Sequence, residues 1–213
     1  MSLYNETKNE DGSSSAILPT PAIGGVGLLA DWTKSATIAF KGTGDIIVAV
    51  GKRVGHLGQS LWLRECHGRE DGPPPPVDLA AERLAGELIR DAIGDGMLSA
   101  VHDVSDGGVA VAIAEMALAG GVGAMLDRGQ PYGPARTFFA EDQGVYIVTV
   151  HDNCLLDFLM RAEGRGVPAE AIGRTIAKRI VFETKDGDHV VPLDALRSAH
   201  EGFFRKLMGD VIA

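Results

Sequence analysis

Runs of apolar, β-branched residues bounded by glycine or by charged residues predict the strands of this chain. The clearest runs are Asp45–Gly51 (DIIVAVG), Met97–Val104 (MLSAVHDV) and Val145–Val150 (VYIVTV). Gly120–Leu126 reads as a further strand. Ile23–Leu29 (IGGVGLL) is predicted as a short strand in which the glycines indicate a bulge or the close approach of another backbone.

Helical spacing of apolar residues follows several of these runs. Asp78 is the expected N-cap of a helix that Gly94-Asp95-Gly96 ends. Its predicted apolar face consists of large aliphatic side chains: Leu79, Leu84, Leu88, Ile89 and Ile93. Three further helices are predicted at Val109–Leu118, Asn153–Ala162 and Leu193–Leu207. A small αβ piece is predicted over Ala169–Phe182, and a hairpin turn at Asp186-Gly187.

The alternation of strands and helices predicts an α/β or α+β fold around a mixed sheet, and α+β, in which helices flank the sheet, is the class we expect. The length of 213 residues is enough to bury a core. Residues 21–213 are expected to form one domain, and residues 1–20 an appendage whose polar stretch 5–15 has the composition of a loop. Because Ser2-Leu3-Tyr4 is a short, partly apolar piece with nothing before it to pair with, the chain is expected to be part of a longer protein.

Composition and charge exclude several classes of protein. The formal net charge of −9 disfavours a broad nucleic-acid surface, which needs the opposite sign. No apolar run approaches the ~20 residues of a membrane span, and the first residues do not have the pattern of a signal peptide. Two isolated cysteines provide neither a disulfide framework nor a zinc site, so a soluble protein of the reducing cytoplasm is expected. The 28 glycines indicate tight turns and close backbone approaches.

The segment His102–Gly108 (HDVSDGG) has the strongest chemical pattern, because it joins a predicted strand to a predicted helix. Two glycines at such a turn direct backbone N–H groups and the positive end of a helix at one point, where phosphate or carboxylate binds. Asp103 and Asp106 could hold Mg²⁺ or hydroxyl groups there. The structural alternative is that Ser105 or Asp106 caps the helix and the glycines only permit the turn.

Two further segments leave a functional and a structural interpretation open. Glu141-Asp142-Gln143 precedes a buried strand, so its side chains either point into a site or solubilise the strand end. The glycines of Gly55–Ser60 (GHLGQS) either admit a ligand or allow a tight turn before Leu61-Trp62-Leu63, which is helix or strand. The spacing of the histidines, serines and cysteines matches no P-loop, zinc-protease or nucleophile-elbow motif, so spacing alone demonstrates no catalysis.

Five segments in one order carry a resemblance to a known family. They are Ser2–Thr7 (SLYNET), Leu18–Gly27 (LPTPAIGGVG), Gly58–Ser60 (GQS), Pro74–Leu79 (PPPVDL) and His102–Ala112 (HDVSDGGVAVA). This order resembles the C-terminal part of the phosphoribosylformylglycinamidine synthase family, and the resemblance covers essentially the whole chain. It implies a PurM-like C-terminal domain, the second of two in the synthetase, preceded by the last loop of a PurM-like N-terminal domain.

The resemblance implies an activity for the full-length protein. Members are ATP-dependent amidoligases of purine biosynthesis that convert formylglycinamide ribonucleotide to formylglycinamidine ribonucleotide with ammonia derived from glutamine. ATP activates the amide oxygen and ammonia displaces the phosphate, with Mg²⁺ as the metal. The implied partners are the rest of the synthetase chain, a glutaminase and small accessory subunits. The fragment alone is expected to be inactive.

The resemblance assigns few site residues to this part of the family. It implies that Ser2 contacts substrate, and it places no catalytic residue and no metal ligand in the chain. Asp103 and the run Glu141-Asp142-Gln143 correspond to metal-binding and substrate-binding positions of the working half. Because Asp142 stands where serine is usual, and Gly144-Val145 where a charged pair is usual, the residues Asp103, Asp106, Glu141 and Gln143 are expected to form a vestigial pocket.

A stand-alone domain that binds a phosphate-bearing metabolite at the His102–Gly108 turn is the alternative function. Related synthetases of the same superfamily fit less well, because they do not carry the first two segments at this spacing. Apolar faces that the domain would turn toward the rest of a synthetase are expected to be exposed here. Self-association, with a homodimer as one outcome, is therefore expected.

Overall fold

The chain divides into two compact units, and the computed structural model describes residues 5–17, 23–127 and 132–209 of it. The units are Met1–Thr33 and Lys34–Ala213. The first contains an antiparallel hairpin of β1 (Glu6–Lys8) and β2 (Ser14–Ala16). The predicted boundary between residues 20 and 21 falls within residues 18–22, outside the described residues, and stays a prediction.

The predicted strand at Ile23–Leu29 is wrong. This segment has no regular secondary structure, and Ile23, Val26 and Leu28 are almost completely exposed. A strand needs a hydrogen-bonded neighbour to offset the loss of conformational freedom. In the described part of the chain no strand pairs with this segment, so its apolar composition alone does not produce a ladder.

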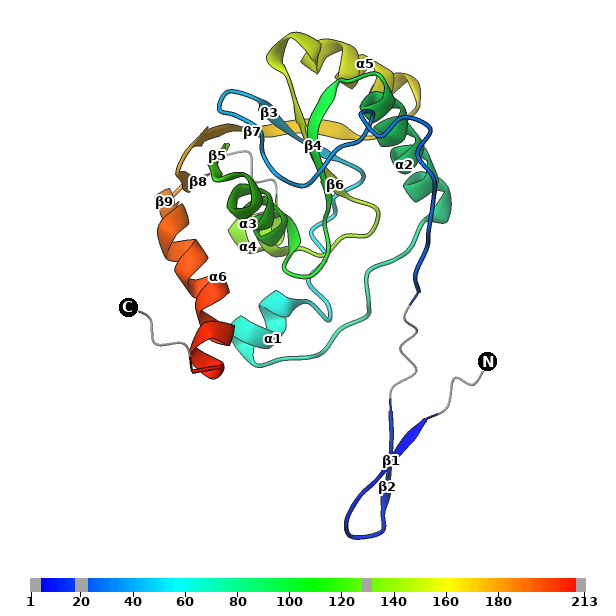
Figure 1. The fold of residues 1–213 in the computed structure, drawn as a ribbon, viewed down its shortest axis with the longest axis vertical. Coiled ribbons are helices and arrows are strands. Elements are labelled where there is room, and N and C mark those ends of the chain that lie inside the picture. The colour runs from blue at the N-terminus through cyan, green and yellow to red at the C-terminus, as the bar shows by residue number, and fades with distance from the viewer. Residues whose placement is uncertain (1–4, 18–22, 128–131, 210–213) are drawn as a thin grey trace. The chain divides into compact units, whose positions relative to one another are not determined.

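The second unit is built on a seven-stranded mixed sheet with the order β4-β6-β3-β7-β5-β8-β9 (Figure 1). All neighbouring strands are antiparallel except β5 and β8, which are parallel. The strands are β3 (Ile46–Val50), β4 (Leu98–Asp103), β5 (Val122–Leu126), β6 (Tyr146–Val150), β7 (Ala169–Ala177), β8 (Arg179–Thr184) and β9 (Gly187–Pro192). The predicted mixed sheet is confirmed.

Helices cover both faces of this sheet. They are α1 (Leu61–His67), α2 (Leu79–Gly94), α3 (Gly108–Gly120), α4 (Pro134–Phe139), α5 (Leu155–Gly164) and α6 (Leu193–Leu207), with a short 3₁₀ turn η1 (Asp152–Cys154) before α5. Side chains of α2 and α5 form one core with one face of the sheet, and side chains of α3, α4 and α6 form another core with the opposite face. The predicted α+β class, with helices flanking a mixed sheet, is therefore confirmed.

Strand β3 is apolar at every position because it is covered on both faces. Ile47 and Ala49 belong to the core under α3, whereas Ile46, Val48 and Val50 belong to the core under α2 and α5. Successive side chains of a strand point to opposite faces, so a strand covered on both faces needs an apolar residue at every position.

Helix α2 begins where the sequence predicts but buries a different face. The Asp78 carboxylate accepts hydrogen bonds from the backbone N–H groups of Ala80 and Ala81, as an N-cap does. Leu79 and Leu84 are exposed, so their prediction as core residues is wrong. The residues that α2 buries are Ala85, Leu88, Ile89 and Ala92. They lie three or four positions apart and so share one side of the helix, where the small alanines let it pack close to the sheet.

The αβ piece predicted over Ala169–Phe182 is also wrong, because the segment contains no helix and consists of β7 and β8 joined at Lys178. Strand β7 lies between β3 and β5, and a Cβ at Gly173 would meet the carbonyl oxygen of Met125 at 2.1 Å. Pairing on both edges therefore decides the conformation, over local preference. The hairpin at Asp186-Gly187 is confirmed, since Thr184 pairs with Gly187.

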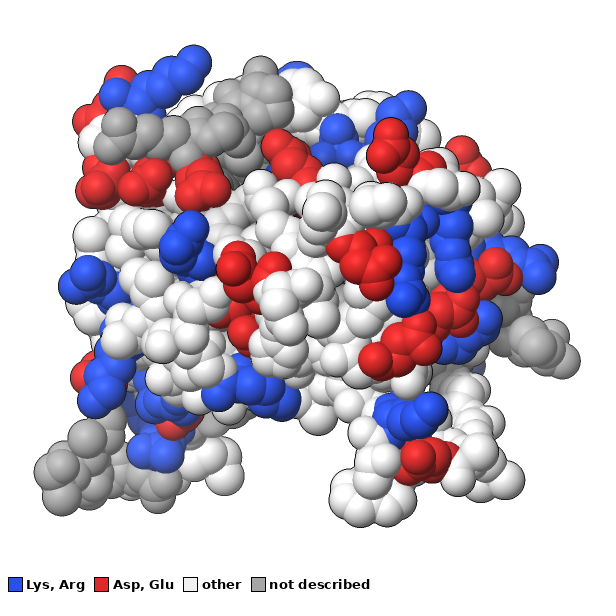
Figure 2. Space-filling model, turned by 90° about the horizontal axis from the view of Figure 1, so that it is seen from above, with Lys and Arg blue, Asp and Glu red and all other residues white. Residues whose placement is uncertain are grey.

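Charged side chains of both signs are intermixed on the surface. Among the described residues on the face shown in Figure 2, Lys and Arg lie next to Asp and Glu and do not form a separate broad basic area. Two ion pairs join α5 to the end of α2: Arg161 to Asp95 at 2.5 Å and Arg165 to Asp91 at 2.9 Å. None of the helices in the described part of the chain is long and apolar enough to cross a membrane.

Phe158 provides a test of the core under α5, because its side chain is fully buried. Phe158→Ala is expected to lower the free energy of unfolding by about 3–5 kcal/mol, through lost burial and the cavity that remains. Met160→Ala, on the exposed side of the same helix, is the matched control and is expected to change it by less than about 0.5 kcal/mol. Denaturant unfolding measures both. Equal effects of the two substitutions would contradict this packing.

Candidate functional site

The four residues predicted to form a pocket line one surface hollow of the second unit. Asp103, Asp106, Glu141 and Gln143 all contribute to it, and its volume is about 570 Å³. Its other lining residues come from the segment before α2, from α2 itself, from the turn after β4 and from the start of β6; they are Pro75, Glu82, Val104, Ser105, Gly144, Val145 and Tyr146. The structure thus brings together four predicted residues that lie up to 40 positions apart in the sequence, from Asp103 to Gln143.

The turn between β4 and α3 forms one wall of the hollow, and its glycines have a packing role. Gly108 has a φ of +70°, and a Cβ there would lie 2.6 Å from the carbonyl oxygen of Ala140. Only glycine therefore permits both the turn and the close approach of the backbone that ends α4. The three atoms nearest to such a Cβ all belong to the backbone of residues 138–140.

Neither interpretation of this turn holds in its simple form. The N-cap of α3 is Gly107, with no side-chain hydrogen bond, so the prediction that Ser105 or Asp106 caps the helix is wrong. The Ser105 hydroxyl instead donates to Asp103 at 2.7 Å. The Gly107 N–H, which the sequence predicts to be available for a ligand, donates to the Glu141 carboxylate at 2.7 Å.

Glu141 joins the starts of two helices. The same carboxylate oxygen that accepts from Gly107 also accepts from the backbone N–H of Leu61 at 2.8 Å, the first residue of α1. The N-terminus of a helix carries partial positive charge and unpaired N–H groups, so a carboxylate is favourable at each. Glu141 therefore occupies the kind of position that an anionic ligand would take.

Asp142 is buried, with 6% of its surface exposed, and accepts from three consecutive backbone N–H groups. One carboxylate oxygen accepts from Val54 at 2.9 Å and Gly55 at 3.0 Å, and the other from His56 at 3.2 Å. Asp142 is therefore not a solubilising residue at a strand end. The sequence gives little signal of these bonds, because the donors precede Asp142 by 86 to 88 residues.

The loop Gly55–Ser60 is a packed turn. The Gln59 side chain donates to the carbonyl oxygens of Glu70 and Gly72, and a Cβ at Gly58 would lie 2.4 Å from the carbonyl oxygen of Pro73. The glycine therefore admits the backbone of the proline-rich segment, in agreement with the tight-turn interpretation. Ser60 caps α1, because its hydroxyl accepts from the N–H of Leu63 at 3.3 Å.

The hollow is acidic. Glu82, Asp103, Asp106 and Glu141 line it, and no Lys or Arg is among the lining residues. Asp106 and Gln143 are exposed, whereas Ser2 lies outside the described residues. Among residues 5–17, 23–127 and 132–209, no group of three or more His, Cys, Asp or Glu side chains is placed to hold a metal ion.

Two groups in the hollow have shifted pKa values. Hydrogen bonding from the Ser105 hydroxyl is the largest cause that lowers the pKa of the Asp103 carboxyl, and His102 adds to the effect. Burial raises the pKa of the Tyr146 hydroxyl, and the charges of Glu82 and Asp103 add to that shift. At neutral pH Asp103 is therefore ionised and Tyr146 is neutral.

The fold and this hollow define a class of protein: an α+β domain whose mixed sheet lies between two layers of helices. Solved structures share the fold. T. maritima PurL complexed with FGAR has a TM-score of 0.64 and 19% sequence identity, covering 76% of this chain and 29% of that chain. E. coli HypE, a hydrogenase maturation protein, has a TM-score of 0.54 and 23% identity, covering 76% of this chain and 54% of that chain. At these identities the likeness shows the fold alone.

The chain belongs to the family described as AIR synthase related protein, C-terminal domain, whose model matches residues 42–185. The phosphoribosylformylglycinamidine synthase subunit PurL of Zymomonas mobilis subsp. mobilis is 51% identical over 210 residues, and that of Rhodopseudomonas palustris strain BisB5 is 51% identical over 211. Both matches cover 98% of this chain, but it spans only 28% and 27% of those relatives. The resemblance seen in the sequence is confirmed.

Ser105→Ala is expected to raise the pKa of Asp103 toward the ordinary value, because the variant loses the hydroxyl that donates to the ionised carboxylate. In the unsubstituted protein the lowered pKa contributes stability above the unfolded-state pKa, and this contribution is lost as the pH falls through the folded-state pKa. The variant loses this contribution. Carboxyl-detected NMR titration measures the shift.

Asp11 is the control for this titration, because its pKa is lowered by Ser13 within the first unit and should not change. An unchanged Asp103 pKa in Ser105→Ala would contradict the assignment of Ser105 as the main cause.

Proposed function

We propose that this chain is the C-terminal portion of an ATP-dependent carbon–nitrogen ligase of purine biosynthesis. The longer protein would convert formylglycinamide ribonucleotide, ATP and glutamine-derived ammonia to formylglycinamidine ribonucleotide. The observation that carries the proposal is the 51% identity to PurL subunits over 98% of this chain. Since the chain spans about a quarter of those relatives, the reaction belongs to the longer protein.

In this proposal the hollow is a vestigial pocket: it corresponds in position to a working site, and its residues have a structural role. Asp103, Asp106, Glu141 and Gln143 form its wall. In this proposal Glu141 has a structural role, because its carboxylate accepts hydrogen bonds from the backbone N–H groups at the starts of α1 and α3. Ser2 is the one residue for which we propose contact with substrate. The residues 21–213 would form the PurM-like C-terminal domain.

ATP and Mg²⁺ belong to the longer protein. The nucleotide has support from relatives of the same fold, since T. maritima PurL has been solved with ATP and with AMPPCP. A magnesium site is not supported by the described residues of this chain, because they contain no suitable group of three metal ligands and because Asp103 is engaged by Ser105. No step of the reaction is therefore assigned to a metal held by this chain.

The proposed partners are the rest of the synthetase chain, a glutaminase and small accessory subunits. A structure of PurLQS from Thermotoga maritima, which shares the fold, supports an assembly of several chains. The cytoplasm is the proposed compartment, in keeping with two cysteines that are both free.

The isolated chain is expected to form no product from formylglycinamide ribonucleotide, ATP and ammonium, because the proposal places the reacting groups outside it. The measurement is product formation by chromatography, with a full-length PurL relative as the positive control. Turnover by the isolated chain above the level of an enzyme-free blank would overturn the assignment of catalysis to the longer protein.

A stand-alone phosphometabolite-binding domain is the competing function, and calorimetry separates the two. That function requires micromolar binding of a nucleotide or ribonucleotide phosphate that Asp106→Ala abolishes. We expect no such binding to the isolated chain, since Glu141 already holds the Gly107 N–H and the hollow is acidic. Binding that depends on Asp106 would contradict the proposal and support the competing function.

The isolated chain is expected to self-associate through exposed apolar side chains. The end of α6 and the residue that follows it expose four of them, each by more than 60%: Phe203, Phe204, Leu207 and Met208. Light scattering across a concentration series is expected to show a rising mean mass, which Phe203→Ser with Phe204→Ser reduces. Arg205→Ser, on the same exposed stretch, is the control. A constant monomer mass at high concentration would contradict this expectation.

A further inference from the structure

The segment Val54–His56 directs three successive backbone N–H groups at one point. All three donate to the two carboxylate oxygens of Asp142, at 2.9, 3.0 and 3.2 Å. The middle residue, Gly55, has a φ of +77°, the left-handed conformation that turns adjacent N–H groups toward the same side. Such a concave arrangement of N–H groups, called a nest, binds anions.

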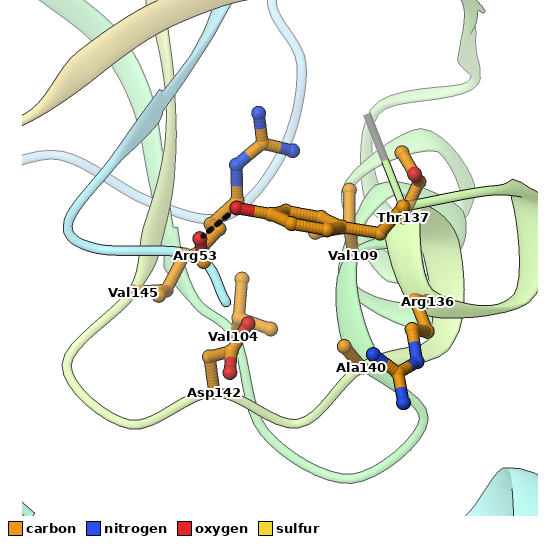
Figure 3. Close-up of a pocket in the computed structure, with 9 residues that line it drawn as sticks. Arg53, Val104, Val109, Arg136, Thr137, Ala140, Asp142 and Val145 are labelled. Atoms are coloured by element: carbon orange, nitrogen blue, oxygen red, sulfur yellow. Dashed lines mark hydrogen bonds between the residues drawn. The ribbon is translucent and has the colours of Figure 1, made fainter. Parts of the chain in front are cut away.

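The backbone compensates for the charge of this carboxylate. Asp142 is almost completely buried, and within the described part of the chain no Lys or Arg forms an ion pair with it. Arg53 and Arg136 line a small cavity of about 10 Å³ beside Asp142, but the Arg53 guanidinium pairs with Glu170 and points away from the Asp142 carboxylate (Figure 3). The charge is therefore stabilised by hydrogen bonds from the nest, without which burial of the ion would be strongly unfavourable.

The nest has the geometry of a site for an ion, and the side chain that fills it comes from a distant part of the sequence. Asp142 follows the three donors by 86 to 88 residues and reaches them from the segment between α4 and β6. Loss of the carboxylate would leave three donors without an acceptor, with the Gly55 bond buried and the Val54 and His56 bonds partly buried. A small carboxylate ion in solution has the same two oxygens and the same charge, and it could accept the same three hydrogen bonds.

We infer that Val54–His56 is a carboxylate-binding nest whose built-in ligand is Asp142. In the native chain Asp142 keeps the nest occupied, so the loop after β3 holds its shape without an external ion. Removal of the Asp142 carboxylate converts the nest into a site for a small carboxylate ion from solution. The inference rests on the geometry of this loop and does not depend on the proposed ligase.

The test is chemical rescue of Asp142→Ala by formate, because formate has the size and charge of the missing group. The variant is expected to melt about 5–10 °C below the unsubstituted chain, since a charged group with three hydrogen bonds is lost. Sodium formate at a few hundred millimolar is expected to restore at least half of that loss, relative to sodium chloride at equal ionic strength. In NMR spectra the amide resonances of Val54, Gly55 and His56 are expected to shift with the same formate dependence.

Two variants control for general effects of formate. Asp142→Asn fills the nest with a side chain of the same size, so formate should give it no specific gain. Asp78→Ala removes an exposed carboxylate that also accepts from backbone N–H groups, and water can replace it. If Asp142→Ala does not fold in chloride, a higher yield of refolded protein in formate than in chloride supports the inference. Equal melting temperatures, or equal refolding yields, in the two salts would overturn it.

Discussion

Two adjacent carboxylates hold together the part of the molecule where the candidate site lies. Glu141 accepts from the N–H groups of Leu61 and Gly107, and Asp142 accepts from those of Val54, Gly55 and His56. The start of α1, the start of α3 and the loop after β3 therefore converge on one short segment before β6. Buried N–H groups need acceptors, and ionised acceptors form the stronger bonds. Glu141 itself lines the hollow, and Asp142 fixes the loop after β3 from the next position in the chain.

The sheet provides the frame on which these bonds are formed. Because helices cover both of its faces, β3 and β6 are buried and cannot shift register without exposing a full set of apolar side chains. The ends of these strands are thereby fixed, and the loops that leave them begin at defined points. The acidic segment directly precedes β6 and the nest follows β3, and the two strands pair in register from Ile46 with Val150 to Val50 with Tyr146. Adjacent strands thus bring donor and acceptor together although they are far apart in sequence.

Features set by local chemistry could be predicted from the sequence, and features set by distant contacts could not. The cap at Asp78, the buried strand at Val145–Val150 and the turn at Asp186-Gly187 depend on nearby residues, and all three are confirmed. Ile23–Leu29 has the composition of a strand but no neighbour among the described residues, whereas Ala169–Phe182 is strand because β3, β5 and β9 lie beside it. Likewise the sequence grouped Asp103, Asp106, Glu141 and Gln143, four of the residues that line the hollow, but it carries no sign that Glu141 and Asp142 accept from distant backbone.

The charge of the hollow restricts how a longer protein could use it. A phosphate-bearing ligand there would meet Glu82, Asp103, Asp106 and Glu141 and no Lys or Arg side chain of the lining. The Gly107 N–H, the donor that such a turn would offer to phosphate, is already held by Glu141. Attraction of a phosphate would therefore require positive charge from groups outside the lining of this hollow. Local packing explains both glycines of the turn, because a Cβ at Gly108 would meet the backbone of residues 138–140 and a Cβ at Gly107 would lie 2.3 Å from the Val111 side chain. The turn of this chain therefore needs no phosphate to account for its sequence, since Glu141 already accepts from the Gly107 N–H.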